Sequence, residues 1–305
     1  MKIGIPRALL YHRYDVLWTT YFQELGFETI ISPVTNKTIL EDGDRYAIDE
    51  NCLSSKLFFG HVSALIGKCD YIFVPRIANF GHEGVLCSRF EALYDIAVNT
   101  FRGKGTEFIT CDIDVEQKKS ELDAYASLAL QFDKTMTEGA RAYEAAKEAA
   151  KAVQQKKIAA QEALLEKDGI KILVVGHSYN LHDAYIGMPI VQGLKKLDAI
   201  PLLADSTDLD VVRHRYTNIC KSVPWTVNRE LVGAIDLYRD VVDGIILITA
   251  FPCGPDSMMN EMIIRRVTDK PILNLLLDSQ DGNAGIETRL ESFVDIIRFR
   301  KEAQI

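Results

Sequence analysis

The chain has 305 residues and a formal net charge of −8. Hydrophobic residues make up 48% and charged residues 26%, which is typical of a folded globular protein and excludes a disordered chain, a collagen and a disulfide-stapled miniprotein. The acidic balance, with 35 Lys and Arg against 43 Asp and Glu, argues against non-specific nucleic-acid binding, which needs a basic face.

The start of the chain carries charges at Lys2, Arg7, Arg13 and Asp15, so it lacks the uninterrupted apolar core of a signal peptide. No run of residues approaches the roughly 18 apolar residues that a membrane span needs. We therefore expect a cytoplasmic protein with no membrane partner. In that reducing compartment its six cysteines are not expected to form disulfides. No CxxC pair occurs, so the zinc-ribbon and thioredoxin interpretations have no support.

Short apolar runs alternate with helical patterns along the first third of the chain. The runs predict strands, and the periodic segments between them predict helices. The expected strands are residues 2–6, 28–32, 71–74 and 107–110, and the expected helices are residues 16–25, 54–66 and 90–101.

The alternation stops between about residues 114 and 167. Residues 141–165 are rich in Ala, Lys, Glu and Gln, the strong helix formers, and predict one or two long solvent-exposed helices, with an interaction helix for a partner protein as the alternative. The alternation then resumes. The expected strands are residues 171–176, 200–204, 244–249 and 271–277, and the expected helices are residues 189–197, 229–238, 257–267 and 287–300.

Strands that are nearly continuous apolar runs and alternate with helices indicate parallel sheets covered on both faces. The sequence thus predicts an α/β protein in three parts. These are an N-terminal α/β lobe at residues 1–113, a helical connector at 114–168 and a C-terminal α/β lobe at 169–305. The two lobes share an architecture, but the sequence shows no internal repeat beyond it.

Polar residues concentrate after the predicted strands. In an open parallel sheet, ligands bind beyond the carboxyl ends of the strands. The loops that follow four of the strands are residues 75–87, 177–180, 253–257 and 278–285. This concentration is what a cleft between two lobes would show.

Three cysteines, Cys52, Cys87 and Cys253, fall in loops or at helix starts on this edge. A helix N-terminus favours a thiolate through its dipole and its free N–H groups. Three such thiolates from three loops could ligate three irons of a [4Fe–4S] cluster and leave the fourth iron open. Scattered ligands have no fixed spacing, so from the residues alone incidental cysteines remain the simpler interpretation.

The other cysteines and two histidines give weaker signals. Cys69 and Cys220 are expected to be packing residues, whereas Cys111 directly follows a strand and could also face the cleft. His61, within a helix, is expected to be structural. His177 lies at a strand end and is a candidate site residue, and a nucleophile pair with a cysteine is conceivable. No glycine-rich phosphate loop occurs, so a tightly held nucleotide is not expected.

Several segments, in order, resemble the proteins related to 2-hydroxyacyl-CoA dehydratase activases. The superfamily also includes the iron–sulfur subunits of 2-hydroxyacyl-CoA dehydratases, benzoyl-CoA reductase subunits and double-cubane cluster proteins. The resemblance covers roughly residues 1–111 and 171–299. The segments that carry it are KIGIPRAL at 2–9, CLSSK at 52–56 with GHV at 60–62, YIFVPR at 71–76, FPCGPDS at 251–257 and GIETRLESF at 285–293.

This resemblance implies two Rossmann-like or flavodoxin-like lobes with an iron–sulfur cluster in the cleft between them. Cys52, Cys87 and Cys253 take the positions of the three cluster ligands of the family. The cluster would be a [4Fe–4S] cluster or one half of an [8Fe–9S] double cubane. A separate ATP-hydrolysing iron–sulfur activator would supply single low-potential electrons, for reductions such as making a ketyl radical from a 2-hydroxyacyl-CoA.

Six further residues are expected to line the cleft, either anchoring a substrate or orienting the surroundings of the cluster. The candidates for a catalytic role are Arg76, His177 and Asp256, and those for cofactor binding are Lys56, Asn180 and Arg289.

The function expected is an iron–sulfur reductase or a dehydratase-like lyase component acting on a small molecule, with a CoA ester as the family's substrate. A second dehydratase-like subunit or a second copy of the chain is an expected partner. Two alternatives remain open. One is a non-catalytic electron-transfer or scaffold subunit, and the other is a metal-free two-lobed ligand-binding module.

Overall fold

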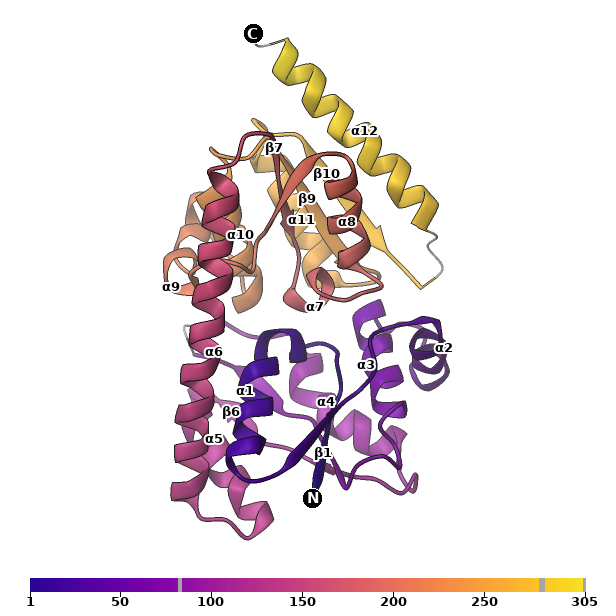
Figure 1. Cartoon of the computed structure of the whole chain (residues 1–305), viewed down its shortest axis with the longest axis vertical. Helices are drawn as coiled ribbons and strands as arrows, with labels where there is room; N and C mark the ends of the chain where they lie inside the picture. Colours follow the sequence, from indigo (N-terminus) through magenta and orange to yellow (C-terminus); the bar gives the residue numbers. More distant parts are fainter. Residues whose placement is uncertain (82–83, 280–282, 304–305) are drawn as a thin grey trace. The chain divides into compact units, whose positions relative to one another are not determined.

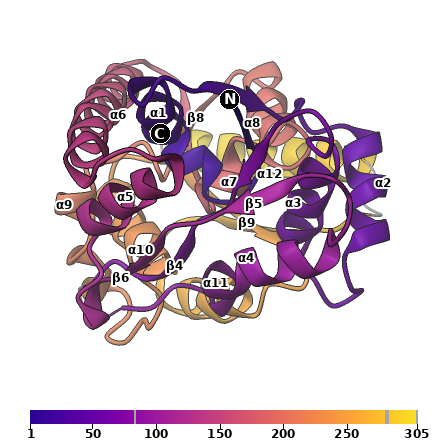
Figure 2. The same ribbon diagram turned by 90° about the horizontal axis from the view of Figure 1, so that it is seen from below.

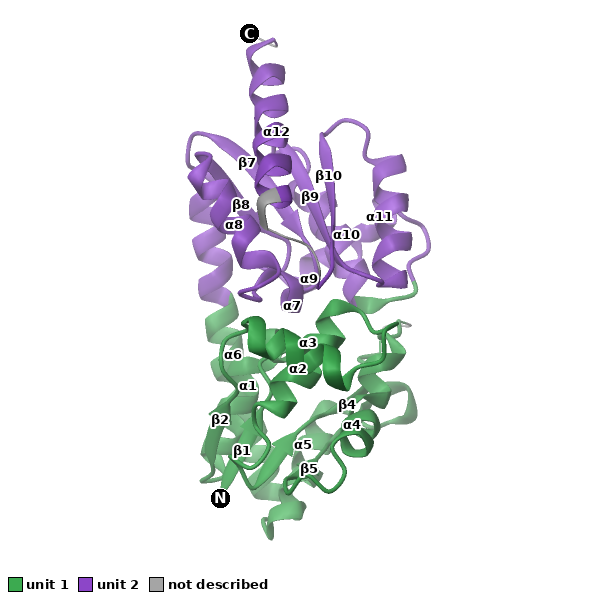
Figure 3. Cartoon of the chain, turned by 90° about the vertical axis from the view of Figure 1, so that its right-hand side faces the viewer, with its two compact units in different colours: residues 1–154, 224–226 green, residues 155–223, 227–305 purple. Residues whose placement is uncertain are grey.

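The computed structural model describes residues 1–81, 84–279 and 283–303 (Figure 1). The chain divides into two compact units, coloured in Figure 3. The first is Met1–Gln154 with Pro224–Thr226, and the second is Gln155–Val223 with Val227–Ile305. Each unit holds a four-stranded sheet surrounded by helices, so the α/β class with two Rossmann-like parts is confirmed. The predicted loops 75–87 and 278–285 include residues 82–83 and 280–282, which lie outside the described residues.

The first unit is built on a parallel sheet with strand order β2-β1-β3-β5. Its strands are short apolar runs, as the sequence predicts. The elements are β1 (Lys2–Ile5), α1 (Tyr11–Glu24), β2 (Glu28–Ile31), α2 (Lys37–Tyr46), α3 (Leu53–Ser63), β3 (Tyr71–Phe73), β4 (Arg76–Asn79), α4 (Ser88–Thr100), β5 (Glu107–Ile109), β6 (Asp112–Asp114), α5 (Glu121–Leu128) and the first part of α6 (Met136–Leu165).

The second unit has a parallel sheet with strand order β10-β9-β7-β8. All seven residues of β9 are buried, as expected of a central strand covered on both faces. Helices α8 and α12 pack together on one face, and α10 and α11 cover the other (Figure 3). The elements are β7 (Ile170–Val175), α7 (Ser178–Leu181), α8 (Gly187–Lys196), β8 (Ala199–Leu203), α9 (Leu209–Val212), α10 (Thr226–Tyr238), β9 (Gly244–Ala250), α11 (Gly254–Arg266), β10 (Ile272–Leu277) and α12 (Asn283–Glu302).

The two four-stranded sheets have the same strand order. Taken in chain order within each unit, the strands lie as 2-1-3-4 in both sheets, which is the flavodoxin-like arrangement. In each sheet the second strand lies on one side of the first strand, and the third and fourth strands lie on the other side. The topological switch points therefore lie between β1 and β3 in the first unit and between β7 and β9 in the second. A ligand is expected at the carboxyl end of such a point.

Two features of the first unit were not predicted. Strands β4 and β6 form a separate two-stranded parallel sheet (Figure 2), and α2 precedes α3. Both strands have three or four residues and end in polar or charged side chains, so they lack the apolar run that marks a buried strand. The α2 sequence, KTILEDGDRY, carries five charged residues and a glycine. Its short apolar stripe is therefore not recognisable from the sequence alone.

Helix α6 is one continuous helix of 30 residues that contributes to both units (Figure 1). It is exposed over much of its length, as expected, but it also has buried positions. Ala142, Tyr143 and Ala146 are buried in the first unit. In the second unit the Gln161 amide is buried, accepts the Leu203 N–H at 2.7 Å and donates to the Leu203 carbonyl at 3.0 Å. One polar side chain thereby fixes this helix to the end of β8.

The segment Pro224–Thr226 pairs with the first unit although its neighbours on both sides belong to the second. The Val85 N–H donates to the Pro224 carbonyl at 3.0 Å, and the Thr226 N–H donates to the Val85 carbonyl at 3.0 Å. This parallel bridge between Val85 and Trp225 lies two residues before Cys87. The chain thus passes between the units within α6 and again on each side of this segment.

Helices α2 and α3 cross with their backbones in close contact. A Cβ on Gly60 would lie 1.9 Å from the Ile39 carbonyl oxygen, and a Cβ on Gly43 would lie 2.2 Å from the Lys56 carbonyl oxygen. Only glycine fits at either position. Because Cys52 is the residue that begins α3, this crossing also fixes the place of that cysteine. None of the helices within the described residues is both long and apolar enough to cross a membrane.

Candidate functional site

The two switch points differ in chemistry. In the first unit, the residues after β1 and β3 line a small apolar pocket that includes Pro6, Leu9 and Pro75. In the second unit, β7 leads through Gly176 to His177, and β9 leads to Cys253. Polar groups able to bind or react therefore gather at the switch point of the second unit.

A buried carboxylate, Asp256, is the centre of this polar group. His177 Nε2 lies 2.8 Å from Asp256 Oδ1, and Asn228 Nδ2 donates to the same oxygen at 3.0 Å. Asp256 is 4% exposed and His177 is 7% exposed, so this hydrogen-bonded group is closed to bulk water. The His177 ring also stacks on Tyr179, with centroids 4.8 Å apart and planes within 7°. The structure thus brings together two of the predicted catalytic residues.

The Asp256 carboxyl is held in its ionised form. Burial alone would raise its pKa. The electrostatic effect of His177 and hydrogen bonds from His177, Asn228 and Cys253 outweigh burial, so the pKa lies below its ordinary value. A buried carboxylate that stays charged at neutral pH needs such donors.

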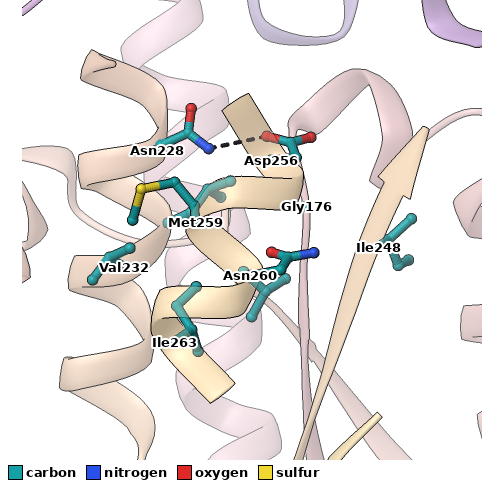
Figure 4. Close-up of a pocket in the computed structure, with 10 residues that line it drawn as sticks. Gly176, Asn228, Val232, Ile248, Asp256, Met259, Asn260 and Ile263 are labelled. Carbon is teal, nitrogen blue, oxygen red and sulfur yellow. Dashed lines mark hydrogen bonds between the residues drawn. The ribbon is translucent and has the colours of Figure 1, made fainter. Parts of the chain in front are cut away.

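A small cavity lies beside this group, between α10 and α11. Figure 4 shows Asn228 and Asp256 joined at its rim, with Asn260 and Met259 on the same helix as the carboxylate. The volume of the cavity, counted as the positions that the centre of a water molecule can occupy, is about 10 Å³. This is close to what one ordered water requires. The cavity is therefore too small for an organic substrate.

The three cysteines predicted as ligands share one local geometry. Cys52, Cys87 and Cys253 are the N-cap residues of α3, α4 and α11 respectively. Each is half-buried. Cysteine is not among the residues usually preferred at the N-cap. None of the three side chains accepts a capping hydrogen bond from its own helix, but the positive end of a helix dipole still favours a thiolate at this position.

Two of these thiols contact the side chain three residues further on, at the third helical position. Cys52 Sγ lies 3.2 Å from Ser55 Oγ, and the Cys253 side chain is one of the groups that lower the pKa of Asp256. The third helical position lies one turn after the N-cap, so its side chain can reach the side chain of the N-cap residue. The thiols at α3 and α11 are thus each paired with a polar group.

The remaining three cysteines have packing environments. Cys111 and Cys220 are buried, and burial raises the pKa of both thiols. Cys69 donates to the Leu65 carbonyl at 3.5 Å and lies against Gly4, and burial raises its pKa to about 11. Thiols kept protonated in this way are poor metal ligands. The expectation that Cys69 and Cys220 pack agrees with these positions.

The three N-cap cysteines are half-buried thiols, and thiolates are the usual protein ligands of an iron–sulfur cluster. Cys52 and Cys87 belong to the first unit, and Cys253 belongs to the second. Within the described ranges, no three His, Cys, Asp or Glu side chains form a group placed to hold a metal ion. A cluster held jointly by these three cysteines is therefore proposed and not observed.

The other predicted site residues are engaged in structural contacts. Arg76 pairs with Asp95, its Nε lying 3.1 Å from Oδ2, and stacks over the Tyr94 ring at 4.5 Å. Lys56 pairs with Asp44 of α2 at 3.1 Å.

Two more predicted residues lie in the second unit. Arg289 donates to the Asn274 carbonyl at 2.6 Å, on the edge strand β10. Asn180 is fully buried in α7. Asn228 and Ser55, by contrast, were not predicted. The spacing of three residues from an N-cap cysteine is the signal that could have found Ser55.

His61 is structural, as expected, and it makes the first unit sensitive to acid. It is fully buried, with Ser32 Oγ 2.8 Å from Nδ1 and Thr35 Oγ1 3.0 Å from Nε2. Burial, with smaller contributions from nearby positive charge, lowers its pKa to about 3. The unfolded chain has an ordinary histidine pKa of about 6.5. Between these values only the unfolded state takes up the proton, so stability is full above pH ~6.5 and falls as the pH falls toward 3.

We expect the free energy of unfolding of the first unit to fall by up to about 1.4 kcal/mol per pH unit in that window. Denaturant titrations at pH 7 and 4.5 measure it. His61→Gln should flatten this slope, whereas His214→Gln, at an exposed histidine, should leave it unchanged. An equal slope in the wild-type chain and His61→Gln would rule out this origin.

The chain was compared with known families and structures. Residues 2–207 match the family described as CoA enzyme activase uncharacterised domain. No curated protein matches the chain.

Similar solved structures include the SBP FpvC of Pseudomonas aeruginosa in complex with Ni²⁺, at 14% identity and a TM-score of 0.28, over 99% of this chain and 97% of that one. The same protein with Mn²⁺ has 13% identity and a TM-score of 0.29, over 99% of both chains. ZnuA has 12% identity and a TM-score of 0.26, over 98% of both chains. Similarities this low carry no argument about the present chain.

Proposed function

The chain belongs to the family described as the CoA enzyme activase uncharacterised domain, and on that basis we propose that it is an iron–sulfur protein serving a CoA-dependent enzyme system. Cys52, Cys87 and Cys253 would hold a [4Fe–4S] cluster or one half of an [8Fe–9S] double cubane. The observation that carries the proposal is their shared geometry. Each is a half-buried N-cap of a helix, whereas the other three cysteines have pKa values raised by burial.

When bound, such a cluster supplies single low-potential electrons and one open iron able to act as a Lewis acid. The chain's own residues provide the rest. The three ligands would lie at the positive ends of the dipoles of α3, α4 and α11, and burial and hydrogen bonds around the sulfurs would set the potential of the cluster. The buried pair of His177 and Asp256 lies beside the third ligand.

The electron donor in this proposal is a separate ATP-hydrolysing iron–sulfur activator, and the substrate is a CoA ester. The sequence holds no glycine-rich phosphate loop, which favours the role of electron acceptor over that of ATPase. A second dehydratase-like subunit, or a second copy of the chain, would complete the substrate site, since the cavity beside Asp256 holds no more than about one water.

Iron and acid-labile sulfide, measured per chain after strictly anaerobic purification and reconstitution, test the proposal. About four of each support a single cubane, and about eight irons support a double cubane. A chain that remains free of iron and sulfide after reconstitution would overturn the redox function and favour the metal-free ligand-binding module.

A further inference from the structure

Two side chains of the first unit that are more than nine-tenths buried each carry a polar atom with no hydrogen-bond partner within the described residues. The atoms are Oδ1 of Asn51 and Oγ1 of Thr226. Asn51 is 2% exposed and Thr226 is 3% exposed, so bulk water does not reach these atoms. A buried polar atom that stays unpaired destabilises a fold, and native proteins keep few of them. Both atoms therefore call for a partner.

Both side chains lie beside a cysteine that is a proposed cluster ligand. Asn51 directly precedes Cys52, the residue that begins α3, and its backbone N–H is bonded within the preceding turn. The backbone N–H of Thr226 donates to the Val85 carbonyl at 3.0 Å, two residues before Cys87. In both residues the backbone is thus held in place, while a side-chain atom is left without a bond.

The two unpaired groups are able to donate hydrogen bonds to sulfur. A threonine hydroxyl carries one donor and two acceptor sites. A half-turn of an asparagine amide exchanges its oxygen and its nitrogen, and the partner that the amide meets decides the orientation. The sulfur atoms of an iron–sulfur cluster accept hydrogen bonds, which help to set its reduction potential. A cluster bound at the neighbouring cysteines would therefore be a suitable partner for both groups.

We propose that Asn51 and Thr226 donate hydrogen bonds to sulfur atoms of the cluster bound at Cys52 and Cys87. This inference rests on the proposed function, because the cluster is the partner that pairs the two groups. In the chain without a cluster, each group lowers the stability of the first unit. Local departures of this kind from the rules of stable folding are expected at functional sites.

The stability of the iron-free chain tests the first half of the inference. Thr226→Val and Asn51→Leu keep the approximate size of each side chain and remove its polar atoms. Each should raise the melting temperature of the apoprotein by about 2–4 °C, because a buried group without a partner is lost. An unchanged or lower melting temperature would overturn the inference for that residue, since it would show that the group is already paired, for instance by an ordered water.

Thr35→Val is the matched control in the same unit. Thr35 is 7% exposed, and its hydroxyl lies 3.0 Å from Nε2 of the buried His61. The same exchange of a hydroxyl for a methyl group here removes a hydrogen bond, so it should lower the melting temperature by about 2–4 °C. Opposite signs in Thr35→Val and Thr226→Val would separate the loss of an unpaired hydroxyl from the general effect of the substitution.

The reduction potential of the reconstituted chain tests the second half of the inference. Reduction adds negative charge to the cluster, and a hydrogen-bond donor stabilises that charge. Loss of one such bond should lower the equilibrium constant for one-electron reduction about tenfold, which makes the potential about 59 mV more negative. A redox titration should show this shift in Thr226→Val and in Asn51→Leu, whereas Thr35→Val should keep the wild-type potential.

The outcomes separate this inference from the function on which it rests. If the variants hold iron and sulfide but keep the wild-type potential, the inference is overturned and the proposed function stands. A shift of equal size in Thr35→Val would also overturn the inference, because it would reflect a general change in the first unit. A wild-type chain that takes up no iron would overturn the proposed function and the inference together.

Discussion

Replacing Cys52, Cys87 or Cys253 by alanine, one at a time, is expected to remove nearly all of the iron that the reconstituted chain holds. A cluster bound through three thiolates leaves two protein ligands after any one loss. Each of these cysteines begins a helix and reaches solvent, so alanine removes a ligand without opening a cavity in the core. Iron analysis and the visible absorption of the cluster measure the effect.

The chain supplies its own controls for this series. Cys220→Ala is matched to Cys253 in the second unit, and Cys69→Ala is matched to the two cysteines of the first unit. Both should leave the iron content within error of the wild-type value, at some cost in stability because both thiols are packed. Cys111→Ala tests whether that buried cysteine takes part. Iron loss in Cys220→Ala equal to that in Cys253→Ala would contradict the assignment.

Gly60→Ala is expected to be the most destabilising single methyl addition in the first unit. The new Cβ would lie 1.9 Å from the Ile39 carbonyl oxygen and 2.8 Å from the Ile39 carbonyl carbon, and backbone atoms cannot rotate away. Overpacking of this kind costs about 1–3 kcal/mol and occasionally more. We expect a loss of about 3 kcal/mol in the free energy of unfolding, or roughly 6–12 °C in the melting temperature of a unit this size.

Gly285→Ala provides the opposite case for comparison. Gly285 lies within α12, and a Cβ there would meet no atom within 4 Å. Alanine is a better helix former than glycine by about 1 kcal/mol, so this variant should be neutral or slightly stabilising. Differential scanning calorimetry of the two variants measures both effects. A Gly60→Ala chain as stable as the wild type would show that α2 can move away from α3 without loss.

The strands of both four-stranded sheets could be predicted because each is an apolar run. GIILITA of β9, for example, is buried at every position, and a run of that kind fits few other environments. Helix α2 and strand β4 could not be predicted for the opposite reason. Their burial depends on contacts with distant segments, such as the α2–α3 crossing at Gly43 and Gly60. Local pattern carries no information about such contacts.

The candidate site also contains residues whose place could be predicted from the sequence and residues whose place could not. Cys253 and His177 follow strands directly, so their place at the sheet edge could be predicted from the strands alone. The hydrogen bond between Asn228 and Asp256 joins residues 28 positions apart on two helices. No motif links them, and Asn228 lies within a helix that otherwise looks ordinary. Partners of this kind become visible only when the helices are placed against each other.

The bridge between Val85 and Trp225 has a consequence for how the chain folds during synthesis. A nascent chain that ends at residue 223 contains every other part of the first unit but lacks the three residues that pair with Val85. The loop before Cys87 therefore receives its last backbone hydrogen bonds only after the ribosome has translated β7, α8 and β8 of the second unit. The first unit is therefore completed only after more than a third of the second unit has been synthesised.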